Sequence, residues 1–219
     1  MKLKRMGDVT LIQLSDTDSN IYLVGDVVID SGTGFNFPSM RYLFKMMKKN
    51  MDDVKLVLCT HTHFDHIGGA RYFFESKIAC SDVGVPVIEK ADIDMSAADF
   101  YNGQLKPRKV DQVLKEGDKI KAGKYNLEVI RTPGHTDCSI TLYDKAKKIA
   151  FTGDSVFADG IGSTEFINSN ADELRKSLEK LSKMKIDRYF PGHGEPVEKQ
   201  GAKRIETLLK EADKAEPVE

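Results

Sequence analysis

The chain has 219 residues, of which 40% are apolar and 31% are charged, a composition typical of a folded globular domain and not of a disordered chain. Its 33 basic residues are balanced by 34 acidic ones, so the net charge of −1 gives no positive field for nucleic acid or an anionic membrane. No apolar run approaches the ~20 residues of a transmembrane helix, and the basic N-terminus lacks the apolar stretch of a signal peptide. With three widely spaced cysteines, we expect a single cytoplasmic domain over residues 1–219 that acts on a small molecule, and nothing here indicates its oligomeric state.

Short apolar stretches separated by Gly, Asp and Ser turns predict three strands in the first third of the chain. These strands are Thr10–Leu14, Ile21–Val24 and Val27–Asp30. Apolar residues at helical spacing then predict an amphipathic helix around residues 40–47, and the KLVLC stretch predicts a buried strand at Lys55–Cys59. Residues 70–75 are predicted to be helical, and residues 81–103 helical or irregular.

Strands return in the second half of the chain, at Val110–Leu114, Tyr125–Arg131, Ser139–Tyr143, Lys148–Phe151 and Asp187–Phe190. Between the last two, Asn170 and Glu173 predict a capping box that opens a helix. A terminal helix is indicated by the spacing of Ile205, Leu208 and Leu209. This order of strands, helices, strands and helices predicts an α/β fold in which two sheets carry helices on their outer faces, a four-layer sandwich.

All five histidines lie in three short loops that follow predicted strands. The richest of these loops is CTHTHFDHIGG, residues 59–69, with His61, His63, Asp65 and His66. At alternate positions of an extended loop, His61 and His63 can point the same way, while Asp65 and His66 can point to a neighbouring centre. Imidazole and carboxylate are ligands that suit zinc, and also iron or manganese. The segment therefore predicts a metal site.

The other two histidines occupy matching positions. His135 lies in TPGHT and His193 in PGHG, each on a glycine-containing turn after a predicted strand. Between them, Asp154 in FTGDS offers a carboxylate at another strand end. Loops at strand ends commonly build active sites in α/β folds, so we expect these three residues to join the first group.

These motifs, taken in order with the VVIDSGTG strand end at Asp30, resemble the metallo-β-lactamase superfamily over nearly the whole chain. The resemblance implies an αβ/βα sandwich with two metals at one edge, and it implies that Asp30 fixes the orientation of a ligand. The implied ligands are His61, His63 and His135 for one metal and Asp65, His66 and His193 for the second, with Asp154 bridging.

Within the superfamily, a carboxylate at Asp154 resembles the glyoxalase II and related hydrolase branch, since true β-lactamases have other groups there, such as a cysteine. The FTGDSVF and DSNIYLV stretches also resemble this branch. Glyoxalase II has a C-terminal helical domain that binds glutathione, whereas residues 194–219 suffice for about one helix. Cys138 stands where the family usually has Gly; we expect a small buried residue there, the alternative being a thiol close to the metals.

The resemblance implies a hydrolase that cleaves a thioester, ester or lactone with two zinc ions as cofactors, iron or manganese being alternatives. A pair of metals lowers the pKa of a shared water to about 7, which makes that water a nucleophile. Asp65 is the expected catalytic residue, because it can orient the nucleophile and carry a proton to the leaving group. We expect the segment Phe157–Asn168, together with parts of residues 81–105, to border the substrate pocket.

Other functions stay open at this point. Persulfide dioxygenases resemble glyoxalase II and hold one iron by two histidines and one aspartate, which here would be His61, His135 and Asp154. Some nucleases of the superfamily share the histidine motif, but the even charge argues against nucleic acid. A non-catalytic protein with a purely structural metal is the last alternative.

Overall fold

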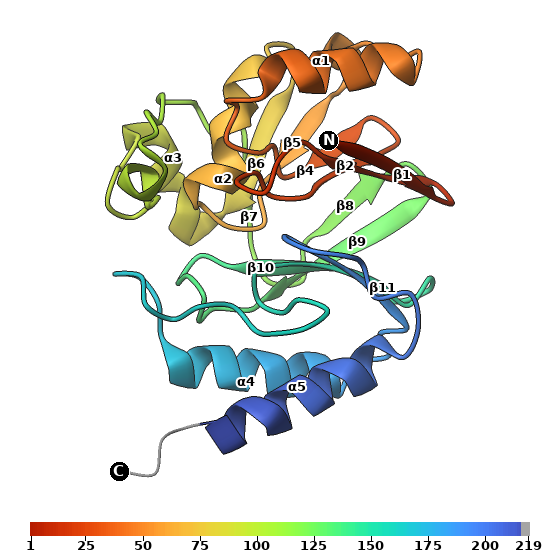
Figure 1. Ribbon diagram of the computed structural model, residues 1–219, viewed down its shortest axis with the longest axis vertical. Helices are drawn as coiled ribbons and strands as arrows, with labels where there is room; N and C mark the ends of the chain where they lie inside the picture. Colours follow the sequence, from red (N-terminus) through yellow and green to blue (C-terminus); the bar gives the residue numbers. More distant parts are fainter. Residues whose placement is uncertain (216–219) are drawn as a thin grey trace.

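The computed structural model describes residues 1–215 and shows two β-sheets stacked face to face, with helices on both outer faces (Figure 1). Helix α1 (Phe37–Met46) covers the first sheet. Helices α4 (Ala171–Ser182) and α5 (Gly201–Ala215) lie side by side over the second. The predicted α/β sandwich of four layers is confirmed.

The first sheet has seven strands, and their order in the sheet is their order in the chain. They are β1 (Lys2–Met6), β2 (Val9–Gln13), β3 (Ile21–Val24), β4 (Val27–Ile29), β5 (Leu56–Leu58), β6 (Lys77–Ser81) and β7 (Gln112–Leu114). Strands β1 to β4 pair antiparallel, whereas β4 to β7 run parallel. Because parallel strands end at the same edge, the loops after β4 and β5 emerge next to each other.

The second sheet has five strands in the order β12-β11-β10-β9-β8. They are β8 (Lys119–Ala122), β9 (Tyr125–Arg131), β10 (Ile140–Asp144), β11 (Ile149–Gly153) and β12 (Arg188–Pro191). Strands β9 and β11 are each antiparallel to β10, and β12 is parallel to β11. The strands β9, β11 and β12 therefore also end at one common edge.

Three apolar cores hold the four layers together, one at each interface between layers. Between the sheets, Tyr22 meets Phe151 and Phe190 with ring centroids 5.3 and 5.6 Å away. Apolar residues of α1 pack on the first sheet, and those of α4 and α5 pack on the second. Successive side chains of a strand point to opposite faces of its sheet, so each sheet contributes side chains to two cores.

The remaining helices are short: α2 (Phe64–Ile67), α3 (Val85–Lys90) and the 3₁₀ segments Met51–Asp53, Gly68–Tyr72, Asp82–Gly84 and Ala98–Tyr101. The helix predicted over residues 70–75 is wrong, because only the 3₁₀ segment ending at Tyr72 forms there. A Cβ added at Gly69 would lie 2.0 Å from the carbonyl oxygen of Ser31, so this segment packs directly against the backbone of the loop after β4. None of the helices within residues 1–215 combines the length and the apolar character needed to cross a bilayer.

The edge strands β1 and β8 were not predicted from the sequence. KLKRM in β1 and KIKA in β8 both mix basic and apolar residues. An edge strand has one unpaired side facing solvent, and lysines there discourage pairing with another chain. Charge therefore masked the strand signal in both segments.

Candidate metal centre

The loops after five strands from both sheets bring the candidate ligands to one edge of the sandwich. The segment with His61 and His63 follows β5, and α2 then carries Asp65 and His66. The loops after β9, β11 and β12 carry His135, Asp154 and His193, and Asp30 follows β4. The common strand ends described above are the reason why ligands as far apart in the sequence as His61 and His193, 132 positions, meet here.

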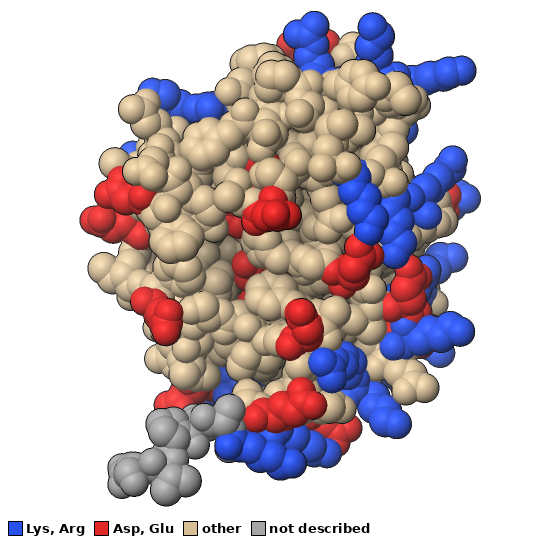
Figure 2. Space-filling view, viewed as in Figure 1, with Lys and Arg blue, Asp and Glu red and all other residues tan. Residues whose placement is uncertain are grey.

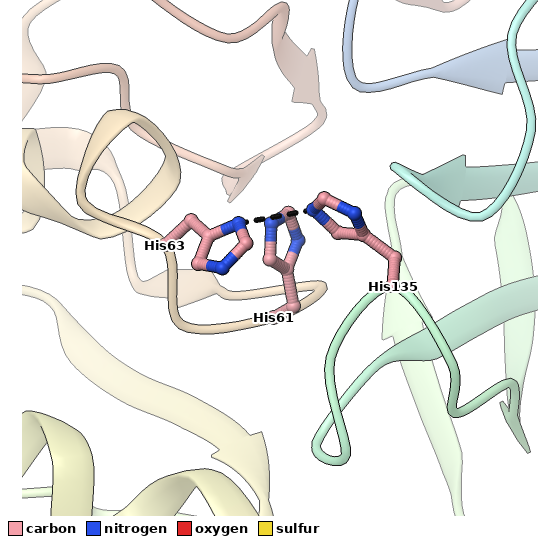
Figure 3. Close-up of side chains that lie close together, drawn as sticks. All are labelled: His61, His63 and His135. Carbon is pink, nitrogen blue, oxygen red and sulfur yellow. Dashed lines mark hydrogen bonds between the residues drawn. The ribbon is translucent and has the colours of Figure 1, made fainter. Parts of the chain in front are cut away.

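Within the described residues, the first group of potential ligands is His61, His63 and His135, whose ligand atoms all lie within 4.8 Å of one another. All three side chains are buried. Figure 3 shows them converging from two loops, with His63 Nδ1 and His135 Nε2 separated by 3.0 Å. Two ring nitrogens bound to one ion at ~2.0–2.1 Å each are separated by a similar distance.

The second group consists of Asp65, His66 and His193, again within 4.8 Å. His193 Nε2 lies 2.9 Å from Asp65 Oδ2, and His66 Nε2 lies 3.5 Å from the same oxygen. Asp65 and His66 are buried, whereas the His193 side chain is 33% exposed. The centre therefore opens to solvent on the side of His193.

Asp154 lies between the two groups. Its Oδ1 is 3.2 Å from His66 Nε2, while its Oδ2 is 3.4 Å from His193 Nε2 and 3.7 Å from His135 Nε2. It also forms a third set of potential ligands with His61 and His66. One carboxylate thus faces both groups with its two oxygens.

Several atoms aimed into this space are buried without any hydrogen-bond partner in the described part of the chain. They are the Nε2 atoms of His61 and His66 and Oδ1 of Asp154. Buried polar atoms nearly always have a partner, and leaving one without costs about 1–3 kcal/mol. Nitrogen and carboxylate oxygen are also the donors that zinc and iron take, so these residues fit a pair of metal ions.

Hydrogen bonds on the far side of the rings fix which nitrogen faces the centre. His66 Nδ1 donates to Asp30 Oδ2 at 2.8 Å, and His135 Nδ1 donates to the carbonyl oxygen of Ser163 at 2.8 Å. A carbonyl only accepts, so neutral His135 keeps a lone pair on Nε2. Asp30 is itself held, because Thr60 donates to it from both its backbone nitrogen and its hydroxyl at 2.8 Å. The predicted orienting role of Asp30 matches these contacts.

The two groups differ in their electrostatics. Burial lowers the pKa of His61 well below its usual value, that of His63 to about 3, and that of His135 as well, so these imidazoles are neutral. Burial opposes the charged form of His66 too, but the carboxylates of Asp154, Asp65 and Asp30 outweigh it and hold the pKa of His66 well above its usual value. The first group consists of neutral donors, and the second of histidines paired with carboxylates.

For Asp154, burial alone would raise the pKa, but His66 and His193 outweigh burial and hold it well below the usual range. The same two histidines lower the pKa of Asp65 against the effect of burial. Both carboxylates are therefore ionised at neutral pH, which is the form that binds a metal or accepts a proton.

Cys138 is fully buried, as expected for a small residue of the loop. Its Sγ lies 3.2 Å from Thr62 Oγ1 and 3.3 Å from Thr136 Oγ1. Burial raises the pKa of this thiol. The side chain thus packs among hydroxyls behind the metal-facing loops and is absent from all three groups of potential ligands.

The segment Phe157–Asn168 lies against the centre. Besides the Ser163 carbonyl, it supplies Phe166, whose ring centroid is 4.4 Å from that of His63 and 5.7 Å from that of His135. The sequence predicted that this segment borders the substrate pocket, but it did not predict these contacts. The Ser163 contact uses a backbone oxygen, which leaves no residue-type signal in the sequence.

Asn20 is a further residue that the sequence did not single out. Its Nδ2 donates to the carbonyl oxygens of Pro191 and Gly194, both at 2.9 Å, and its backbone nitrogen donates to Gly192 at 2.6 Å. Tyr22 Oη donates to the Pro191 carbonyl at 2.7 Å. These bonds hold the loop of His193 from the opposite sheet.

Comparison with known proteins agrees with this geometry. A probable metallo-hydrolase of Methanocaldococcus jannaschii is 33% identical over 190 residues, covering 81% of this chain and 88% of that protein. An acyl-coenzyme A thioesterase of Gallus gallus is 28% identical over 204 residues, covering 82% of this chain and 73% of that protein.

Two solved structures share the fold. The crystal structure of TTHA1623 in a di-iron-bound form is 25% identical with a TM-score of 0.71, covering 85% of this chain and 92% of that one. The native FEZ-1 metallo-β-lactamase from Legionella gormanii is 22% identical with a TM-score of 0.75, covering 95% of this chain and 92% of that one.

A model of one family matches residues 14–193, a range that begins before the first strand-end loop of the centre and ends at its last histidine. Together with the four layers and the ligand groups at the sheet edge, this match shows that the chain belongs to the metallo-β-lactamase superfamily.

Proposed function

We propose that this chain is a single-domain hydrolase that uses two zinc ions to cleave a thioester, ester or lactone. The observation that carries the proposal is the pair of ligand groups with Asp154 between them. One metal would need only one of the groups. A structural metal site would be closed, whereas here the one-third exposure of His193 leaves an opening for substrate.

In this proposal, His61, His63 and His135 hold one ion, and Asp65, His66 and His193 hold the other. Asp154 would be their shared ligand, since its Oδ1 lies on the side of His66 and its Oδ2 on the side of His135 and His193. When bound, the two ions would polarise the substrate carbonyl and lower the pKa of a water molecule.

The protein's own groups then position the reactants. Asp65 is ionised, and its Oδ2 faces the open side of the centre next to His193, so it can accept a proton from the attacking water and pass it to the leaving thiol or alcohol. Asp30 and the Ser163 carbonyl keep His66 and His135 in fixed orientations, so little reorganisation is needed during the reaction.

The similarity to an acyl-coenzyme A thioesterase supports a thioester or another acyl substrate. The glyoxalase II-like assignment is supported instead by the carboxylate of Asp154 between the two ligand groups. A small-molecule substrate fits the charge distribution, since the face seen in Figure 2 has basic and acidic side chains interspersed along its margin and no continuous basic surface.

Iron is the main alternative to zinc, because a structural relative binds two irons. A dioxygenase with a single iron held by His61, His135 and Asp154 is the competing function. It would leave His63, His66 and His193 without a role, although all three point into the same space.

The test is a metal analysis of protein purified without added metal, combined with histidine variants. We expect two equivalents of zinc in the wild type and one in His66→Ala and in His193→Ala, each with most of the thioesterase activity lost. His63→Ala, from the other group, should instead lose the ion of the first site. A single iron that survives both His66→Ala and His193→Ala would refute the two-metal hydrolase and favour the oxygenase.

A further inference from the structure

An apolar surface borders the centre on the side of the first ligand group. The ring of Phe166 covers His63 and His135, as described above. Its neighbour Ile167 is 76% exposed and is among the most exposed large apolar residues of the described chain. Contiguous exposed apolar surface beside a site is typical of ligand binding, whereas a single exposed residue would need no explanation.

This surface is fixed in place by hydrogen bonds. The backbone nitrogen of Asp137 donates to the Asn168 carbonyl at 3.0 Å, and Ser169 Oγ donates to the His135 carbonyl at 2.6 Å. Asn168 Nδ2 donates to the Met95 carbonyl at 3.2 Å, which ties the segment to residues 93–101. Phe166 and Ile167 are thus held against the loop that carries His135.

The segment over residues 93–101 adds more apolar surface next to α2. Phe100, 73% exposed, contacts Tyr101 with ring centroids 5.1 Å apart, and Tyr101 contacts Phe64 at 6.0 Å. The backbone nitrogen of Phe64, the residue after His63, donates to the Ser96 carbonyl at 2.8 Å. Two separate segments therefore place exposed aromatic and aliphatic side chains near the centre, with Tyr101 beside Asp65 of the second ligand group.

The other side of the centre is polar. A cleft of about 330 Å³ opens beside His193. It is lined mainly by groups that form hydrogen bonds, among them Gln13, Ser15, Asp16, Asp18 and Asn20. The centre thus separates an apolar surface from a polar cleft.

We infer that the substrate is an acyl compound with an apolar acyl chain, which rests on Phe166 and Ile167, and a polar leaving group, which enters the cleft beside His193. This inference rests on the proposed hydrolase function and specifies its substrate. In the reaction, the oxygen of water bonds to the acyl carbon, the bond from that carbon to sulfur or oxygen breaks, and the leaving thiol or alcohol takes up a proton.

The first test is a series of thioesters that share one polar thiol and carry straight acyl chains of increasing length. For the wild type, kcat/KM should rise about twofold for each methylene that contacts the surface, because a half-buried methylene gains about half the effect of a fully buried one. Ile167→Ser and Phe166→Ala should flatten this dependence. The readout is the ratio of kcat/KM for a long-chain thioester to kcat/KM for a short-chain one. This ratio is independent of the fraction of the protein that is loaded with metal.

Phe74→Ala is the matched control. Phe74 is 69% exposed, like Ile167, but it lines a different depression beside α1. This variant should retain the chain-length dependence of the wild type. Thermal unfolding of each variant separates an effect on the surface from a loss of folded protein.

A second measurement does not require turnover. Isothermal titration with straight-chain carboxylates, from acetate to decanoate, should show affinity rising with chain length in the wild type and much less so in Ile167→Ser. If none of the thioesters, esters or lactones is cleaved, the proposed function fails, and the titration still decides on the apolar surface. Equal dependence on chain length in wild type and both variants, or no dependence in the wild type, would overturn the inference.

Discussion

Replacing Asp30 with Asn should weaken the binding of the metal ion assigned to His66 by about 10- to 100-fold while leaving the protein folded. Asp30 Oδ2 accepts a hydrogen bond from His66 Nδ1 at 2.8 Å, which leaves His66 Nε2 free to face the centre. In the variant, an amide nitrogen at that position would donate a hydrogen bond to Nδ1. The imidazole proton would then shift to Nε2, the atom that must bind the metal.

Asn is the appropriate substitution for two reasons. Residue 30 has a φ of 57°, in the left-handed region, which Asn tolerates better than other non-glycine residues. Asn can also keep its oxygen on the backbone nitrogen of Thr60, 2.8 Å from Asp30 Oδ1. The variant therefore loses one charge-assisted hydrogen bond, worth about 1.5–3 kcal/mol of unfolding free energy. Asp30→Ala would leave donors of both Thr60 and His66 unpaired, at about 1–3 kcal/mol each.

The assay is competition with a chromophoric chelator, combined with urea unfolding. Asp144→Asn is the control, because Asp144 is also buried and accepts bonds from the backbone nitrogens of Asn126 and Lys147, both at 2.8 Å, away from the centre. It should lose stability but retain both metal ions. Wild-type affinity for both ions in Asp30→Asn would refute the argument that Asp30 sets the tautomer of His66.

Three further predictions follow from the geometry. Gly192→Ala should lose the bridged metal pair in an elemental analysis, because its Cβ would lie 1.9 Å from Asp154 Oδ1; two retained equivalents would contradict this. Asn20→Ala should cost about 1–3 kcal/mol in urea unfolding and weaken binding of the ion assigned to His193 about tenfold in the chelator assay, because the loop loses the two hydrogen bonds that Asn20 Nδ2 donates. In metal-free protein, the unfolding free energy should rise between about pH 5 and 6.5, since unfolded His63 binds a proton that the folded side chain, with a pKa lowered to about 3, does not. His63→Gln should reduce this rise by up to about 1.4 kcal/mol per pH unit, and an unchanged slope would show that other groups cause it.

Much of the fold could be predicted from the sequence because apolar periodicity marks buried elements. Strands such as Tyr125–Arg131 match the predicted bounds, and Asn170 caps α4 by accepting a bond from the Glu173 backbone nitrogen. Prediction failed for β1 and β8 at the sheet edges, because their exposed lysines interrupt the apolar pattern of a buried strand. Edge strands have fewer partners, so their sequences are governed by solvent and charge as much as by packing.

The sequence by itself determined which chemical groups the candidate centre contains. Imidazoles and carboxylates in loops directly after buried strands, as at His61 and Asp154, are recognisable from residue type and spacing alone. Only the tertiary structure decided how they group: His135 approaches His63 across 72 positions of sequence, and Asp154 faces both groups because β9, β11 and β12 end at one edge. The orientation of His135 by the Ser163 carbonyl was also decided there, since a backbone oxygen has no signature in the sequence and its position depends on how the segment after β11 folds against the loop after β9.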